Sequence, residues 1–391
     1  MGKKTSAGNI TRRDFIKLGA FTTTAAMGLT GLSGVLDMAA GQSGTFPPQP
    51  VYRTLGKTGF KITVVSFGAM LTPEHEVMRA AFDLGVNYVD TARRYMNGRN
   101  EEIVGKAVAG IRGKLYIATK TQPASKTKKE IFQDVETSLT KLKTDHVDII
   151  QVHNVSSKEG TLVPEVREAY VELRKQGKVR FFGITSHSNQ AEVLDAIVDD
   201  PDKFFDTALV GYNFTSSPDV KTAIRRAQAS GVGIIAMKTQ AGGYENAGMQ
   251  GLSPHQAALK WVLDDPHVTA AIPGMKDMGM LREDLSVMGV KFTRKDEKIL
   301  ERYGKAIRPY YCHLCAECEP TCPNHVAIST INRSLMYAQG YRNIDLARAT
   351  YNEIPSPARA SACLECPQCV AHCVNGLDIS SKMRTALSMY G

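Results

Sequence analysis

From residue 51 to about residue 290, eight short apolar segments rich in β-branched residues alternate with segments of helical periodicity. This alternation constrains the fold most strongly, because strand–helix–strand repeats favour a parallel sheet. Eight repeats over about 240 residues fit a closed (β/α)8 barrel of the α/β class, the TIM barrel. The expected strands are 62–67, 88–90, 115–120, 147–153, 179–186, 207–212, 232–237 and 268–272.

A doubly wound open sheet is the structural alternative to the barrel. That fold usually carries a glycine-rich fingerprint after its first strand, and the segment Ser66-Phe-Gly-Ala-Met70 does not match one. A hairpin that turns at residues 56–59 is expected before the first strand, and a helix over residues 294–306 after the last. The barrel domain is therefore predicted over residues 51–303.

Polar side chains end three consecutive predicted strands. Asp90 ends the second strand, Lys120 the third and His153 the fourth, and Tyr95 lies on the loop after the second. An isolated lysine or histidine at such a place is more often structural. However, barrel enzymes gather their reactive groups at the carboxyl ends of strands, so three polar ends in a row favour an active site.

These four residue types together suit the reduction of a carbonyl group. Hydride addition leaves an alkoxide, which needs a proton donor such as the phenol of Tyr95. The ammonium of Lys120 is expected to lower the pKa of that phenol, and Asp90 to keep the lysine charged and oriented. His153 is expected to donate a hydrogen bond to the carbonyl oxygen.

The segments around these residues resemble the aldo-keto reductases over roughly residues 51–300: Asp90-Thr-Ala with Tyr95, Tyr116-Ile-Ala-Thr-Lys120, and Asp148-Ile-Ile-Gln-Val-His153. The resemblance implies a nicotinamide dinucleotide along the last four strands. Leu209 and Met237 depart from the residues usual in the family, and Gly274 and Met280 stand where basic residues commonly hold the NADP 2′-phosphate. Lys276 is a possible substitute, so NAD and NADP both stay open. The implied cofactor-binding residues are Ser186, His187, Met237, Gly274, Met275, Lys276 and Asp284.

All eight cysteines lie between residues 312 and 373, in two quartets of identical spacing. The spacing C-x2-C-x2-C-x3-C resembles the bacterial ferredoxins that hold two 4Fe–4S clusters, in which the fourth cysteine binds the neighbouring cluster. Disulfides and zinc explain the matched quartets less well. Residues 304–391 are therefore expected to form a helix-rich dicluster domain. One cluster would take Cys312, Cys315, Cys318 and Cys373, and the other Cys363, Cys366, Cys369 and Cys322.

The N-terminal segment Thr11-Arg-Arg-Asp-Phe-Ile-Lys17 and the weakly apolar run after it resemble a twin-arginine export signal. We expect a signal over residues 1–40, a linker over residues 41–50, and a periplasmic or extracytoplasmic location. Membrane contact would come only through an uncleaved signal. The net charge is +9, but no dense basic stripe with interleaved aromatic residues indicates nucleic-acid binding.

Taken together, the chain resembles the aldo-keto reductases that carry a C-terminal dicluster domain and a twin-arginine signal. The leading hypothesis is an exported oxidoreductase that interconverts a carbonyl and an alcohol with a nicotinamide cofactor and passes electrons through two 4Fe–4S clusters. Its partners would be a small carbonyl or alcohol, with sugars among the candidates, and a redox protein. Alternatively, the chain is an electron-transfer subunit whose barrel is a docking or sensing module. In a third hypothesis the clusters are only structural.

Overall fold

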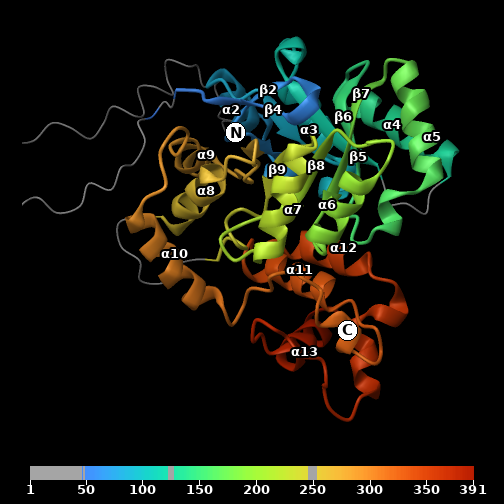
Figure 1. The fold of residues 1–391 in the computed structure, drawn as a ribbon, viewed down its shortest axis with the longest axis vertical. Coiled ribbons are helices and arrows are strands. Elements are labelled where there is room, and N and C mark those ends of the chain that lie inside the picture. Colours follow the sequence, from blue (N-terminus) through green and yellow to red (C-terminus); the bar gives the residue numbers. More distant parts are fainter. Residues whose placement is uncertain (1–45, 47–48, 122–126, 245–252) are drawn as a thin grey trace, which may run out of the picture.

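The computed structural model describes residue 46 and residues 49–121, 127–244 and 253–391. The predicted signal over residues 1–40 lies outside the described residues, as does most of the predicted linker. Eight parallel strands form one sheet in the order β3 to β10 (Figure 1). Parallel bridges from Val65 to Ala271 and from Gly68 to Gly274 join its two edges, so the sheet closes into the predicted barrel.

The observed strands agree with the expected ones except at the first. Residues 62 and 63 belong to a hairpin, and the barrel strand is confined to Phe67 and Gly68. The hydroxyl of Ser66 donates to the carbonyl of Thr63 at 2.6 Å, which turns the chain between hairpin and barrel. The barrel strands are β3 (Phe67–Gly68), β4 (Tyr88–Asp90), β5 (Tyr116–Thr121), β6 (Val147–Val152), β7 (Val179–Ser186), β8 (Thr207–Gly211), β9 (Gly233–Met237) and β10 (Ala270–Ala271).

Amphipathic helices follow the strands and cover the outside of the barrel (Figure 1). Their apolar faces and the outward faces of the strands form one continuous buried cluster. The covering helices are α2 (His75–Asp83), α3 (Asn100–Ala107), α4 (Lys128–Leu142), α5 (Pro164–Lys175), α6 (Gln190–Asp199), α7 (Pro218–Ala229), α8 (Pro254–Asp264) and α9 (Met278–Leu285).

The predicted hairpin seals the amino-terminal end of the barrel. Its strands β1 (Tyr52–Thr54) and β2 (Lys61–Thr63) pair antiparallel. Leu55, Phe60 and Ile62 are buried in the cluster that fills the barrel interior. The ring of Phe60 stacks on Tyr116 with 4.2 Å between centroids. Because this end is filled with apolar side chains, only the carboxyl ends of the strands can present a polar site.

The C-terminal part of the chain is helical. Its α10 packs on α8 of the barrel, with α11 and α12 next to the barrel and α13 farther from it (Figure 1). Its elements are α10 (Arg294–Ile307), α11 (Ile328–Gln339), α12 (Ile344–Asn352) and α13 (Ile379–Tyr390). The first, α10, matches the helix predicted over residues 294–306, and the other three lie in the segment that was expected to be rich in helices. None of the described helices is long and apolar enough to cross a membrane.

A tyrosine-rich cluster joins the two parts of the chain. Tyr244 comes from the barrel side, and Tyr303, Tyr311 and Tyr337 come from α10 and the segments after it. Where α11 ends, Gly340 lies so close to the barrel that an added Cβ would be 2.1 Å from the carbonyl oxygen of Gly242. The C-terminal part therefore shares a core with the barrel.

Candidate active site and cysteine groups

The four predicted catalytic residues meet at the carboxyl end of the barrel. Asp90 is the last residue of β4, Lys120 lies near the end of β5, and His153 directly follows β6. The ammonium of Lys120 donates to the carboxylate of Asp90 and lies 4.7 Å from the ring centroid of Tyr95. The rings of Tyr95 and His153 stand edge to face, 6.0 Å apart. The structure therefore brings these four side chains together.

The Asp90–Lys120 ion pair is deeply buried and held by further hydrogen bonds. The side chains are 2% and 1% exposed. Lys120 Nζ also donates to the carbonyl oxygen of Thr91 at 2.6 Å, and Gln151 Nε2 donates to Asp90 Oδ2 at 2.8 Å. Burial raises the pKa of Asp90 and lowers the pKa of Lys120, and each partner opposes the shift of the other. Because the pair and its hydrogen bonds are already formed, the lysine is fixed beside the tyrosine.

Gln151 is a site residue that the sequence analysis missed. It lies on β6 two positions before His153, so both side chains point to the same face of the sheet. A polar residue inside the apolar run of that strand was the available signal.

The pKa of Tyr95 is high in this structure, although Lys120 lies beside the ring and its charge favours the phenolate. Burial raises the pKa of Tyr95 well above its usual value, the charge of Asp90 adds to the rise, and the charge of Arg333 opposes it. Burial also lowers the pKa of His153 well below its usual value, and Lys120 adds to that effect. At neutral pH the tyrosine is therefore a phenol with a proton to give, and the histidine is uncharged.

A narrow cleft beside Asp90 and Tyr95 contains three of the residues predicted to bind the cofactor, His187, Met237 and Gly274. The Nδ1 atom of His187 is buried and has no hydrogen-bond partner among the described residues. The unpaired Nδ1 atom fits the polar end of a nicotinamide, and the apolar lining of the cleft fits its ring. However, the cleft volume is only about 60 Å³, which is room for a few water molecules.

The aromatic ring that closes this cleft belongs to Tyr341, just beyond α11. The carbonyl oxygen of Tyr341 accepts a hydrogen bond from Lys276 Nζ at 3.3 Å. Lys238 lies above the same ring, with Nζ 5.2 Å from the centroid. The lysine expected to replace the 2′-phosphate ligand is therefore engaged with the C-terminal part, and Tyr341 forms part of the wall of the cleft.

The remaining predicted cofactor residues are buried and bonded within the protein. The hydroxyl of Ser186 donates to the carbonyl of Ser188 at 2.7 Å, and Met275 is fully buried. Asp284 accepts a hydrogen bond from Gln240 Nε2 at 2.6 Å, and burial raises its pKa well above the usual value. None of these three residues lines the cleft.

A second cavity, of about 480 Å³, lies over Tyr95 and His153. One of its walls is the C-terminal part, which contributes Arg333 and Tyr337 from α11 and Glu353 from beyond α12. The sequence analysis missed these residues. Nothing local marks them, because only the docking of α11 brings them to the barrel.

In each cysteine group, the thiols that influence one another include one from the other quartet. The thiols that act electrostatically on Cys312 are those of Cys315, Cys318 and Cys373. Those acting on Cys363 are Cys322, Cys366 and Cys369. Burial raises the pKa of Cys312 and Cys318 to about 12 and that of Cys363 to about 11. In the absence of metal these three thiols are therefore protonated at neutral pH.

The side chains of the cysteine groups do not converge on a site for one metal ion. Among the described residues, no three histidine, cysteine or acidic side chains lie close enough to hold one metal ion. In a cubane each cysteine binds a different iron, so the sulfurs stand apart at four corners. The second group lines a cavity of about 620 Å³.

Polar donors and a strained backbone surround the cysteines. Leu314 N–H points to Cys312 Sγ at 3.4 Å, and Asn324 Nδ2 donates to Cys366 Sγ at 3.2 Å. Leu314 and Ala316, between the cysteines of the first group, have φ values of 59° and 62°. Left-handed backbone at non-glycine residues persists only where the surroundings impose it, and a bound group would do so.

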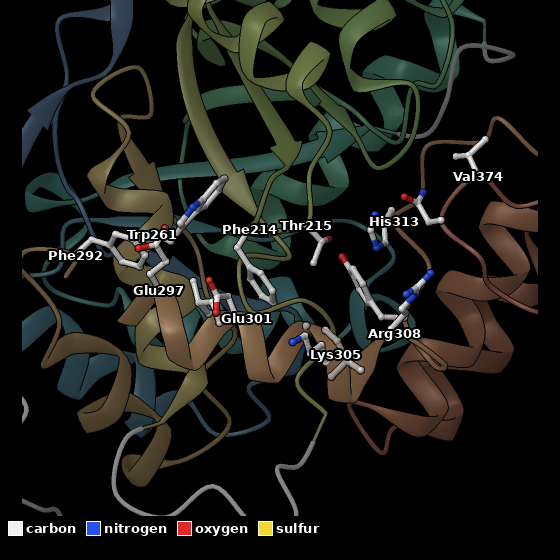
Figure 2. Close-up of a pocket in the computed structure, with 15 residues that line it drawn as sticks. Phe214, Thr215, Trp261, Phe292, Glu297, Glu301, Lys305, Arg308, His313 and Val374 are labelled. Carbon is white, nitrogen blue, oxygen red and sulfur yellow. The ribbon is translucent and has the colours of Figure 1, made fainter. Parts of the chain in front are cut away.

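A separate cavity of about 640 Å³ runs along α10, away from the four catalytic candidates (Figure 2). Phe292 and Trp261 line one end, Phe214 lies near the middle, and Arg308, His313 and Val374 line the other end (Figure 2). The cavity reaches Asn375, whose side chain faces Cys315 Sγ at 3.9 Å. It is therefore a neighbour of the first cysteine group.

Comparison with known proteins gives a family match within the barrel. Residues 72–250 match the model of the Aldo/keto reductase family. The uncharacterized oxidoreductase YqkF of Bacillus subtilis is 35% identical over 149 residues, which are 34% of this chain and 48% of YqkF. This chain therefore spans about half the length of that relative. Aldo-keto reductase AFTS1 of Alternaria alternata is 25% identical over 343 residues, covering 66% of this chain and 92% of AFTS1.

Solved structures show the same barrel. The holo form of aldo-keto reductase AKR11C1 from Bacillus halodurans has a TM-score of 0.56 and 21% identity, over 65% of this chain and 96% of that one. An aldo/keto reductase from Klebsiella pneumoniae in complex with NADP and acetate has a TM-score of 0.55 and 23% identity, over 64% of this chain and 94% of that one. At these identities the likeness concerns the fold.

Proposed function

We propose that this chain, whose barrel contains an aldo/keto reductase family domain, is an oxidoreductase that interconverts a carbonyl and an alcohol. The observation that carries the proposal is the buried Asp90–Lys120 pair beside Tyr95 and His153, under a cavity of about 480 Å³. Paired groups whose pKa values are displaced in a cavity mark sites of proton transfer.

Each residue of this group has a defined part in the reaction. A nicotinamide dinucleotide held beside His187 and Met237 would supply the hydride in reduction and accept it in oxidation. Tyr95 gives its proton to the carbonyl oxygen in reduction and takes it back in oxidation. The neutral His153 donates a hydrogen bond to that oxygen. Lys120, held by Asp90, stabilises the phenolate that Tyr95 becomes.

The cysteine groups support a proposal of two 4Fe–4S clusters that transfer single electrons to a redox partner. The exchanged fourth cysteines, the N–H groups facing sulfur and the strained loop all favour it. Leu364, Val370 and Val374 lie close to cysteines in the chain and are 75%, 56% and 57% exposed. Such apolar exposure suits a partner surface.

A turnover assay tests the oxidoreductase proposal. The chain is purified anaerobically with iron and mixed with NADPH or NADH and a panel of small aldehydes, keto acids and keto sugars. The expected result is carbonyl-dependent oxidation of one dinucleotide. Absence of oxidation with every pair, in a preparation that binds dinucleotide, would contradict the proposal.

The closed cleft favours a second candidate, an electron-transfer subunit whose barrel binds no dinucleotide. The two candidates differ in the effect of Tyr341→Ala. If the barrel is an enzyme, removing the ring should open the cleft and raise dinucleotide affinity by about tenfold or more. Tyr310→Ala, at a tyrosine that is 55% exposed, is the matched control. If neither the unmodified chain nor Tyr341→Ala binds NADPH or NADH, the second candidate is favoured.

We also propose that residues 1–40 direct export by the twin-arginine route, which delivers the chain to the periplasm or another extracytoplasmic space. Arg12 and Arg13 carry this proposal. Changing both to lysine should leave the protein in the cytoplasm, measured by cell fractionation. Unchanged export would contradict the assignment.

A further inference from the structure

We propose that Arg333 of the C-terminal part binds a carboxylate of the substrate, so that the site acts on carbonyl-containing carboxylic acids and their hydroxy acid counterparts. This inference rests on the proposed function, because it adds the substrate class to the same site. Three observations carry it: the burial of the guanidinium, its unused hydrogen-bond donors, and its place in the cavity over Tyr95.

The guanidinium of Arg333 is buried without a full set of partners. The residue is 5% exposed. Its Nη1 donates to Asn154 Oδ1 at 2.9 Å, and its Nη2 lies 3.8 Å from Glu353 Oε2, beyond hydrogen-bond distance. Its Nε has no partner among the described residues. Since burying a charged donor without partners is costly, the Nε and Nη2 edge is suited to an incoming anion.

Arg333 also faces the reacting end of the site. It lines the cavity of about 480 Å³ together with Tyr95 and His153. Its charge contributes to the low pKa of both His153 and His187, and it opposes the rise in the pKa of Tyr95. A molecule whose carbonyl meets Tyr95 can therefore place a second group at Arg333.

The shape and charge of this edge favour a carboxylate. Nε and Nη2 of one guanidinium form a planar fork that matches the two oxygens of a carboxylate. Glu353 also pairs with Arg94 at 3.3 Å, so the acidic residue beside Arg333 is shared between two arginines. A single guanidinium edge of this kind suits a ligand group with one negative charge. The cavity volume is within the range of small-molecule sites.

Paired ligands that differ in charge test the inference. Pyruvate and its neutral amide, pyruvamide, are titrated into the full-length chain by calorimetry and then offered as substrates. The variants are Arg333→Met, which removes the charge, and Arg333→Lys, which keeps it. Arg348→Met, at an exposed arginine on α12, is the matched control.

The expected result is a loss specific to the acid. Arg333→Met should weaken pyruvate binding by about 10- to 100-fold, the range for hydrogen bonds to charged groups, and leave pyruvamide within about threefold. Arg333→Lys should keep part of the preference, and Arg348→Met all of it. Should Arg333→Met fail to fold, the comparison of Arg333→Lys with the unmodified chain still decides the matter, because lysine cannot offer the planar fork.

Three outcomes would overturn the carboxylate site. The first is equal binding of pyruvate and pyruvamide by the unmodified chain. The second is equal weakening of both ligands in Arg333→Met. The third is binding of inorganic phosphate that is tighter than that of pyruvate and equally dependent on Arg333. Because calorimetry needs no turnover, acid binding that depends on Arg333 without carbonyl reduction would instead support this site and contradict the proposed reaction.

Discussion

In the barrel, an ion pair and hydrogen bonds within the protein hold the reactive groups in place. In the cysteine-rich part, the protein holds the thiols only loosely. Lys120 is fixed by Asp90 and Thr91, and Asp90 is fixed in turn by Gln151. By contrast, Cys369 is exposed and the other thiols of its group border an open cavity. A site built from paired charges can keep its geometry without a bound group. Four thiols that face a cavity cannot keep theirs.

The physical reason for this difference is the size and density of the two cores. The barrel has a large continuous core that spans all its strands and helices. The cysteine-rich part has a small core of its own, with Cys318 and Cys322 among its buried members. Small domains bury too little apolar surface to be stable without a staple, and metal clusters provide one. If the cysteines bind the proposed clusters, loss of metal should damage the cysteine-rich part and spare the barrel.

The largest effect is expected from removing iron. Because the cysteines are part of the small core, a chain prepared without iron should lose the structure of α13 and the loops around it, while the barrel strands stay folded. Hydrogen exchange should then show loss of protection over residues 356–391 and full protection in β5 and β6. Equal protection throughout the iron-free chain would contradict the comparison.

The next largest effect is expected from Lys120→Met. Removing one partner of a buried ion pair leaves Asp90 uncompensated, which costs about 3–5 kcal/mol of stability. Carbonyl reduction should also fall by at least about 100-fold, because the phenolate of Tyr95 loses its cation. Urea unfolding and turnover measure the two effects. The double variant with Asp90→Asn is the control: it should regain part of the stability and none of the activity.

A smaller effect is expected in the pH dependence of the free energy of unfolding. His187, which is 8% exposed, should contribute to it. Burial and the charge of Arg333 lower its pKa well below the usual value. As pH falls through about 6.5, the unfolded histidine gains a proton that the folded one does not, so the free energy of unfolding falls. His187 should contribute a loss of about 1 kcal/mol between pH 6.5 and 5.5. His187→Asn should flatten the curve by that amount, and parallel curves for the two proteins would exclude this role.

The sequence predicted the barrel well, because its signals are local. Each strand from β4 to β9 is a short apolar run, and Asp90, Lys120 and His153 occupy the ends of such runs. The cysteine grouping was equally readable, because the spacing of the quartets sets which sulfurs can meet. The first strand was predicted to be longer than it is, because an apolar run does not reveal the turn that Ser66 makes.

What the sequence did not reveal depends on contacts between distant segments. Arg333 and Tyr341 reach the site only because α11 docks on the barrel, with Gly340 against Gly242. Likewise, the pKa of Tyr95 depends on how deeply the docked helices bury it, so the net rise of that pKa could not be predicted from the sequence. The residues at the carboxyl ends of strands can be predicted from the sequence pattern, whereas the C-terminal segments that cover them cannot.

Tyr95→Phe tests the central claim, that the barrel site transfers the proton in carbonyl reduction. The substitution removes one oxygen atom. Among the described residues, the hydrogen bonds that hold the Asp90–Lys120 pair involve Thr91 and Gln151 and not Tyr95, so the melting temperature and dinucleotide binding should hardly change. The measurement is single-turnover oxidation of bound dinucleotide by a carbonyl that the unmodified chain reduces. The account predicts that the rate falls by about 100- to 10,000-fold. Equal rates for the two proteins would contradict it.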